Sequence, residues 1–171
     1  MLNVWVAPVK AIDQAKPVTA DTVRPIRSFF WSPDSTRILF VQDKGGNENW
    51  LLYGVELATG KQTSYTDFDK TQVRVLNVSP KMPGSILIGI NNRNPRFHDV
   101  HRLDLASGRL TLVRENNDYA ELRPTGTTTS YSVSGRLRGA RSRLTDSTGR
   151  ARRGRGSRFH STTISPPSSF R

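Results

Sequence analysis

The sequence repeats itself at a spacing of about 48 residues, and this repeat limits the folds open to the chain. Residues 52–63 (LYGVELATGKQT) align with residues 100–111 (VHRLDLASGRLT), and the same shift places Ile38 on Ile86. We call positions that align in this way repeat-equivalent. A period of roughly 40–50 residues that is built from short strands and turns is typical of β-propeller blades. The repeat therefore favours a β-propeller.

Each repeat contains four short runs with strand character. In the first complete repeat they are IRSFFWSP (26–33), RILFVQD (37–43), WLLYGVEL (50–57) and QTSYT (62–66). These runs are rich in β-branched and aromatic residues, and turn-forming residues separate them, with Gly60 where a positive φ costs little. We therefore predict four antiparallel strands in each repeat.

The repeats are too few to close a ring. Residues 3–19 supply the last two strands of one blade, residues 24–66 a complete blade, and residues 72–114 a second one. A propeller needs roughly four to eight blades. We predict an all-β chain whose residues 1–120 form an incomplete propeller of about two and a half four-stranded blades. Its two flanks would present unpaired strand edges.

Two longer stretches resemble a known family. Residues 29–60 (FFWSPDSTRILFVQDKGGNENWLLYGVELATG) and 97–116 (FHDVHRLDLASGRLTLVREN) are similar to the N-terminal β-propeller of the prolyl oligopeptidase family of serine peptidases, in its dipeptidyl-aminopeptidase/acylaminoacyl-peptidase branch. The resemblance covers about residues 2–120. It implies that the parent protein carries a C-terminal α/β-hydrolase domain and that the propeller limits access of peptide substrates to it. A TolB-like propeller, which would be a scaffold or protein-binding module, is the alternative, because TolB propellers share the WSPD motif.

The catalytic residues that the resemblance implies are absent from this sequence. In that family the nucleophile is a serine in a Gly-x-Ser-x-Gly turn, followed by an aspartate and a histidine. None of the 171 residues forms such a turn, and the three histidines stand outside any such context. We assign no catalytic, cofactor-binding or metal-binding residue and no cofactor, and we predict that this chain alone hydrolyses nothing.

Two polar clusters outside that pattern have ordinary structural interpretations. His98 and His101, beside Asp99, are three positions apart, and residues so spaced in a strand point to opposite faces. Asp43 and Glu48 lie in a Gly- and Asn-rich stretch, which lacks the ligand spacing of a calcium loop. We predict strand residues in the first cluster and a hairpin connection in the second.

Two further expectations concern packing and exposure. Trp31 and Trp50 are expected to fill the space between blades. Residues 93–98 (RNPRFH) are expected to form a polar, exposed loop that faces the hydrolase domain of the parent protein.

The basic character of the chain lies in its last fifty residues. Residues 1–121 carry 15 basic and 13 acidic residues, whereas residues 122–171 carry 11 arginines, no lysine and Asp146 as their one acidic residue. Arg, Ser, Thr and Gly make up 35 of these 50 residues, and such a segment lacks the apolar residues to offset its chain entropy. We predict that residues 121–171 are a disordered tail.

Two explanations for the tail compete. An arginine-rich arm, with GRARRGRGSR at residues 149–158, would bind nucleic acid through phosphate contacts. A lost reading frame in GC-rich DNA would give the same residues, and stepping the codons for residues 127–135 back by one base can spell an acidic turn and a strand. We favour the frameshift, so nucleic acid is not an expected partner.

Composition adds little about location. The chain has no cysteine, and no apolar run approaches the ~20 residues of a membrane helix. Met1 is followed by neither a charged region nor a cleavage site, as a secretory signal would require. We expect a cytoplasmic protein, although a truncated N-terminus would hide a signal.

Overall fold

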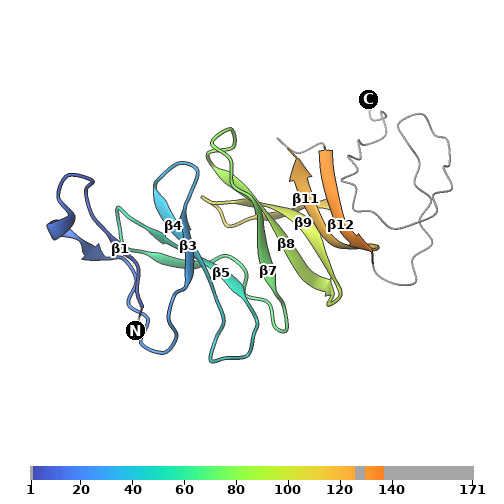
Figure 1. Ribbon diagram of the computed structural model, residues 1–171, viewed down its shortest axis with the longest axis horizontal. Coiled ribbons are helices and arrows are strands. Elements are labelled where there is room, and N and C mark those ends of the chain that lie inside the picture. The colour runs from blue at the N-terminus through green and yellow to red at the C-terminus, as the bar shows by residue number, and fades with distance from the viewer. Residues whose placement is uncertain (1, 126–129, 137–171) are drawn as a thin grey trace.

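A computed structural model describes residues 2–125 and 130–136, and their regular structure is almost entirely β-strand (Figure 1). The strands form two four-stranded and two two-stranded antiparallel sheets. The N-terminal half-blade contains β1 (Trp5–Val6) and β2 (Lys16–Pro17), with the 3₁₀ helix η1 (Ile12–Gln14) between them, and the C-terminal half-blade contains β11 (Tyr119–Thr125) and β12 (Ser130–Arg136). The first full blade contains β3 (Ser28–Trp31), β4 (Arg37–Gln42), β5 (Leu51–Glu56) and β6 (Gln62–Ser64). The second full blade contains β7 (Val73–Asn77), β8 (Ser85–Asn94), β9 (Phe97–Asp104) and β10 (Leu110–Arg114).

The repeat in the sequence is also a repeat in strand pairing. In both full blades the four strands follow one another in sheet order, so each is an antiparallel meander. Leu39 of β4 lies opposite Gly54 of β5, and the repeat-equivalent residues, Leu87 of β8 and Arg102 of β9, lie opposite each other. The predicted all-β, incomplete propeller with four strands in each repeat is confirmed.

The turns between the last two strands of both full blades are closed in the same way. Gly60 and Gly108 have φ values of 70° and 72°, in the left-handed region where glycine avoids the clash of a Cβ. Their N–H groups donate to the carbonyl oxygens of Glu56 and Asp104 at 2.8 and 2.9 Å. The positive φ predicted at Gly60 is confirmed, and the repeat-equivalent Gly108 shares it.

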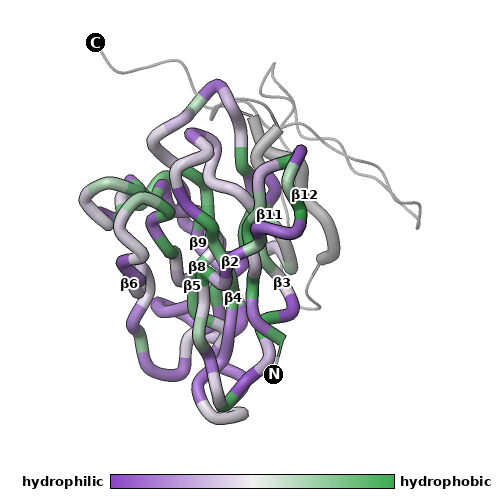
Figure 2. Tube along the Cα trace, turned by 90° about the vertical axis from the view of Figure 1, so that its left-hand side faces the viewer, coloured by the Kyte–Doolittle hydropathy of each residue, from purple (hydrophilic) through white to green (hydrophobic). Residues whose placement is uncertain are grey.

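The largest hydrophobic core lies between the two full blades. Alternate side chains of each strand point to one face of its sheet, so β-branched and leucine residues of neighbouring sheets meet in the space between them. Figure 2 shows hydrophobic stretches along the central strands and hydrophilic ones at many of the connecting loops. The buried members of this core are Leu39, Leu52, Tyr65, Val73, Ile86, Ile88, Ile90, Leu103 and Leu105.

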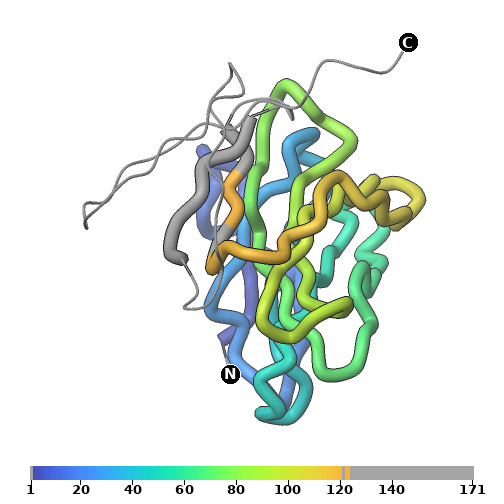
Figure 3. Tube along the Cα trace, turned by 90° about the vertical axis from the view of Figure 1, so that its right-hand side faces the viewer, coloured from blue at the N-terminus to red at the C-terminus, as the bar shows by residue number. Residues whose placement is uncertain are grey.

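Two smaller cores join the half-blades to the full blades. Val4 and Ile26 pack with Phe40, Tyr53 and their neighbours in the first full blade, where the Phe40 and Tyr53 rings stack with centroids 5.4 Å apart. Leu122 packs with Val100 at the other end. Figure 3, which views the molecule from the end that carries β11, shows the coloured part of this strand in front of the second full blade.

Strand structure continues past the boundary expected at residue 120. The strand β11 spans that boundary, and it pairs with β12 from Tyr119↔Arg136 to Thr125↔Ser130. Pro124 does not prevent this pairing, because β11 lies at the edge of its sheet, where a proline is tolerated. One buried leucine, Leu122 at 2% exposure, anchors the strand to the second full blade. The rest of the predicted disordered tail, residues 126–129 and 137–171, lies outside the described residues.

The prediction that Trp31 and Trp50 fill the space between blades is wrong. Their exposed fractions are 48% and 40%. In β3, Phe29 and Trp31 pair with Phe40 and Ile38 and so share the face of the sheet that looks toward the N-terminal half-blade. That half-blade has two strands in the structure, and it leaves the β3 part of this face uncovered.

Candidate functional site

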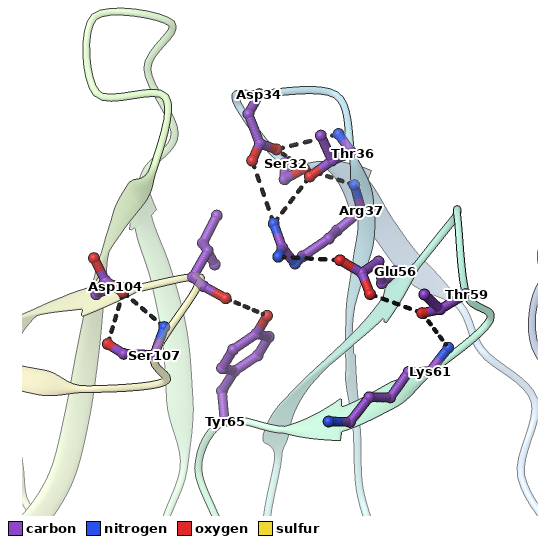
Figure 4. Close-up of polar contacts among 11 residues, drawn as sticks. Ser32, Asp34, Thr36, Arg37, Glu56, Thr59, Lys61, Tyr65, Asp104 and Ser107 are labelled. Atoms are coloured by element: carbon purple, nitrogen blue, oxygen red, sulfur yellow. Dashed lines mark hydrogen bonds and ion pairs between the residues drawn. The ribbon is translucent and has the colours of Figure 1, made fainter.

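The most developed polar site lies at the junction between the two full blades (Figure 4). Side chains of β4, β5 and β6 meet the turn that follows β9 around a cavity of about 290 Å³. We call this cavity and its walls the blade junction. It is lined by Arg37, Gly54, Glu56, Lys61, Thr63, Tyr65 and residues 105–108.

The guanidinium of Arg37 on the first-blade side of the junction is paired with two carboxylates. Arg37 lies 3.3 Å from Asp34 and 3.5 Å from Glu56, measured between guanidinium nitrogens and carboxylate oxygens. Ser32 accepts a hydrogen bond from the Arg37 N–H and donates one to Asp34. Burial would raise the pKa of Asp34, but the hydrogen bonds from Ser32 and Thr36 and the charge of Arg37 hold it below its ordinary value. Asp34, Arg37 and Glu56 thus form an ion-pair network in this wall.

Tyr65 joins the two full blades directly. Its hydroxyl donates a hydrogen bond of 3.0 Å to the carbonyl oxygen of Leu105, and both residues are buried. Burial raises the pKa of the Tyr65 phenol, so it remains a protonated donor. The ring lies across Gly54, where a Cβ atom would come within 2.7 Å of a ring carbon. The Tyr65 ring can therefore occupy this place only because residue 54 is a glycine.

The polar groups at the blade junction make contacts that connect the two full blades. Ser107 donates from its hydroxyl to Asp104 at 2.7 Å, and its N–H donates to the same carboxylate. The described histidines, His98 and His101, are not among the lining residues. The Tyr65 hydroxyl, the Leu105 carbonyl and the turn at residues 105–108 hold the first full blade against the second.

The polar cluster around His98 is a strand cluster, as predicted. His98 and His101 lie in β9, and the Nδ1 atom of His101 is 3.2 Å from the carbonyl oxygen of Asp99. Asp99 accepts two hydrogen bonds from Arg93 at 2.7 and 2.8 Å and one from the N–H of Asn116 at 2.7 Å. Burial would raise the pKa of Asp99, but these hydrogen bonds outweigh it and keep the pKa low.

The stretch around Asp43 is a closed hairpin connection, as predicted. Asp43 accepts hydrogen bonds from Arg24 at 3.1 and 2.8 Å and from the N–H of Glu48 at 3.4 Å. The charge-assisted hydrogen bonds from Arg24 lower the pKa of Asp43 despite its burial. Glu48 adopts a φ of 59°, which lets the loop fold back onto this carboxylate.

Sequence reasoning missed that the Asp43 contact is itself repeated. The residues repeat-equivalent to Arg24 and Asp43 are Gln72 and Asn91, and there the N–H of Gln72 donates to the Asn91 side chain at 2.6 Å. Both contacts tie the entry of a blade to the end of its second strand. The self-alignment alone did not reveal it, because Arg and Asp are replaced by Gln and Asn at the equivalent positions and the donor changes from a side chain to a backbone N–H.

Residues 93–98 form the tip of the β8–β9 hairpin and its flanks. Asn94 pairs with Phe97, and the Arg96 guanidinium lies over the Phe97 ring at 5.9 Å from its centroid. Pro95 and Arg96 are exposed, as predicted, whereas His98 is buried. Arg93 also donates to the carbonyl oxygen of Asn116 at 3.0 Å, which fastens the hairpin base to the connection after β10.

The described residues contain neither a cluster of metal-binding side chains nor a helix that could span a membrane. No group of three or more His, Asp or Glu side chains within residues 2–125 and 130–136 is placed to share a metal ion. No helix in the same residues is long and apolar enough to cross a membrane.

Comparisons with known proteins identify relatives of the chain. No family model matches it. It is 48% identical over 117 residues to dipeptidyl aminopeptidase BIII of Pseudoxanthomonas mexicana, which covers 68% of this chain and 17% of that protein. It is 28% identical over 112 residues to dipeptidyl peptidase family member 6 of Caenorhabditis elegans, with 62% and 15% covered. The chain thus spans less than a fifth of the length of the curated relatives it matches.

Solved structures share the fold. A structure from an analysis of two prolyl endopeptidases matches with a TM-score of 0.53 and 17% identity, over 77% of this chain and 20% of that one. TolB from Acinetobacter baumannii matches with a TM-score of 0.46 and 21% identity, over 74% and 30%. The TolB alternative is not better supported than the peptidase propeller. The chain belongs to the prolyl oligopeptidase family, as a β-propeller portion of its dipeptidyl-aminopeptidase branch.

Proposed function

We propose that this chain is the non-catalytic, substrate-gating propeller portion of a prolyl-oligopeptidase-like serine peptidase. The observation that carries the proposal is the 48% identity over 117 residues to a dipeptidyl aminopeptidase. The chemistry would reside in a C-terminal α/β-hydrolase domain, and peptides would be the substrates. The sequence contains no Gly-x-Ser-x-Gly turn, which such chemistry requires, so the proposal gives this chain no catalytic residue.

The rigidity of the blades supports a gating role. A gate that excludes large substrates must hold its shape, as a close-packed interior does. The full blades are joined by a buried core and by the Tyr65–Leu105 hydrogen bond. The β8–β9 hairpin is the part that we place against the hydrolase domain. Its tip is exposed, and Arg93, bound to both Asp99 and Asn116, holds its base.

A chimera tests the gating role. The segment of dipeptidyl aminopeptidase BIII that matches this chain would be replaced by the matched 117 residues, and cleavage of a dipeptide p-nitroanilide and of a long unstructured peptide would be measured. We expect the chimera to fold, to release p-nitroaniline and to discriminate against the long peptide as its parent does. A control chimera with Arg93→Ala should lose discrimination before it loses cleavage of the short substrate.

Two outcomes would contradict the gating role. One is a folded chimera with an intact hydrolase domain that cleaves long and short peptides equally. The other is hydrolysis of either substrate by this chain alone, because it would locate catalysis in residues to which we give a structural role.

We also propose that the chain is a fragment of its parent and that its reading frame is lost after about residue 120. Support comes from the change in composition, since residues 122–171 contain 11 arginines and no lysine. DNA sequencing across codons 110–140 and downstream tests this. A one-base correction that restores blades and a Gly-x-Ser-x-Gly turn is the expected result. An intact frame would contradict the proposal, and salt-sensitive RNA binding that disappears on deleting residues 122–171 would then favour a nucleic-acid-binding arm.

A further inference from the structure

Two hairpins lie at the same end of the two full blades. In the first full blade residues 43–50 connect β4 to β5, and in the second the β8–β9 hairpin contains the repeat-equivalent residues 91–98. Because the strands of a meander alternate in direction, the segment that leads from β6 into β7 reaches this same end. There Val73, the first residue of β7, pairs with Ile90 of β8. The segment before β7 is therefore placed to contact both hairpins.

The start of β7 is bound to the hairpin of the first full blade. The N–H of Val73 donates to the carbonyl oxygen of Trp50 at 2.7 Å. The Gln72 side chain donates to the carbonyl oxygen of Glu48 at 3.4 Å. The first of these hydrogen bonds is short, so Gln72, the next residue along the chain, is held beside this hairpin.

Asn91 extends this attachment to the second hairpin. Its side-chain oxygen accepts a hydrogen bond of 2.6 Å from the N–H of Gln72. Its side-chain nitrogen donates a hydrogen bond of 3.1 Å to the carbonyl oxygen of Pro95, at the tip of the β8–β9 hairpin. Asn91 is 7% exposed, and hydrogen bonds are stronger where water is excluded. One buried side chain thus connects the second hairpin to the segment that the first hairpin holds.

The hydrogen-bond partners of Asn91 are one donor and one acceptor. A side-chain amide has both an acceptor and a donor and so serves the N–H of Gln72 and the carbonyl of Pro95 together. The repeat-equivalent residue in the first full blade is Asp43, and there the hairpin supplies the N–H of Glu48 in place of a carbonyl. A carboxylate, which only accepts, suits that position. The change from Asp43 to Asn91 therefore follows from the hairpin group that each residue binds.

Strand pairing alone does not fix the direction of the second hairpin tip. The pairing of β8 with β9 shifts register between Ile90 and Asn94, so Asn91 lies where the regular ladder is interrupted. Arg93 holds the base of the hairpin through Asp99, whereas Asn91 binds the tip on the side of the first full blade. The position of the tip relative to the first hairpin therefore depends on Asn91.

We propose that Asn91 is a positioning residue for the discrimination between short and long peptides. It keeps the β8–β9 hairpin at a fixed spacing from the hairpin of the first full blade, so that the opening left for a peptide at this end keeps one width. Asn91 takes no part in the chemistry. The contact lies between the two full blades and uses no residue of the half-blades. This inference rests on the proposed gating function, because it names a residue that maintains the gate.

Asn91→Asp tests the contact with the smallest change of shape. The carboxylate still accepts from the N–H of Gln72, but it places an oxygen against the carbonyl oxygen of Pro95, and the donor to the hairpin is lost. Asn92→Asp is the matched control, because it makes the same change at the next residue, which is exposed. Asn91→Ala removes both hydrogen bonds without adding a charge, and it is the second test where a buried carboxylate prevents folding.

Amide hydrogen exchange on the full chain measures the position of the hairpin through its protection. We expect Asn91→Asp and Asn91→Ala to raise the exchange rate at residues 94–98 by at least about tenfold, since each variant loses a buried hydrogen bond that restrains this segment. Asn92→Asp should change that rate by less than about twofold. Exchange at residues 38–41 of β4 should stay unchanged, because the contact is local. Equal exchange in the Asn91 and Asn92 variants would overturn the positioning role.

The chimera with dipeptidyl aminopeptidase BIII relates the hairpin to discrimination. Asn91→Asp should raise kcat/KM for the long unstructured peptide by at least about fivefold and leave kcat for the dipeptide p-nitroanilide within about twofold, whereas a merely structural defect would lower both together. Asn92→Asp should change neither. If the unmodified chimera and its Asn91→Asp variant discriminate equally, this inference alone fails. An unmodified chimera that does not discriminate would overturn the gating function as well.

Discussion

Replacing Tyr65 by phenylalanine isolates the hydrogen bond that joins the two full blades. The change removes one oxygen and keeps the ring that packs over Gly54. The carbonyl oxygen of Leu105, in a residue that is 2% exposed, would lose the hydroxyl that donates to it at 3.0 Å. An unsatisfied buried polar group costs about 1–3 kcal/mol, so we expect Tyr65→Phe to lower the free energy of unfolding by about 1–2 kcal/mol.

A second tyrosine provides the control. Tyr53 is 8% exposed, as Tyr65 is, but its ring stacks on Phe40 within one blade. Tyr53→Phe should therefore change the free energy of unfolding by less than about 0.5 kcal/mol. Urea denaturation followed by tryptophan fluorescence measures both variants, and thermal melting should show a Tm lower by roughly 4 °C for each kcal/mol lost. Equal stability of the two variants would refute the idea that the Tyr65 hydroxyl fastens the junction.

Three further predictions concern backbone fit and charge. Gly54→Ala should destabilise the chain by about 1–3 kcal/mol through overpacking against Tyr65. Tyr65→Val in the same chain should remove part of that loss, and additive effects in a double-mutant cycle would contradict the contact. The pKa of Asp43 is lowered on folding, so its contribution to stability is present above the unfolded-state pKa of about 3.9 and is lost as the pH falls through the folded value. In acid titrations of Tm, Asp43→Asn should therefore show a smaller fall below pH about 4 than the wild type. Gly60→Ala, at a φ of 70°, should cost about 1 kcal/mol by thermal unfolding. Gly84→Ala, which has open space around its Cβ position, should be nearly neutral.

Periodicity explains how much of the fold could be predicted. The strands of both full blades follow from alternating apolar residues and from the turns at Gly60 and Gly108, because these are local properties of the chain. The exposure of Trp31 could not be predicted in this way. The exposure of Trp31 arises because no neighbouring sheet packs against that part of β3. A rule that places apolar residues inside does not say which sheet lies opposite a given residue.

The C-terminal half-blade shows a different limit. Its strand β11 contains a proline and few apolar residues, so a composition rule places it outside the fold. Packing of Leu122 against Val100 nevertheless holds it, since an edge strand needs only a few buried contacts. The blade junction was missed for a related reason. Neither Gly54 nor Tyr65 indicates the junction by itself, because the function of the glycine is to make room for the tyrosine ring. The two residues belong to separate segments of the chain, so a local pattern does not connect them.

The two blade surfaces that correspond by the repeat have exchanged large and small residues. The first full blade combines Gly54 with Tyr65, whereas the repeat-equivalent positions in the second hold Arg102 and Val113. In the second full blade, a tyrosine at position 113 would have an arginine beside it in place of the glycine that makes room for Tyr65. Tandem repeats that stay too alike are prone to pair with the wrong neighbour during folding. We therefore expect divergence at these four positions to favour one neighbour for each blade, so that the contacts themselves specify the order of the blades.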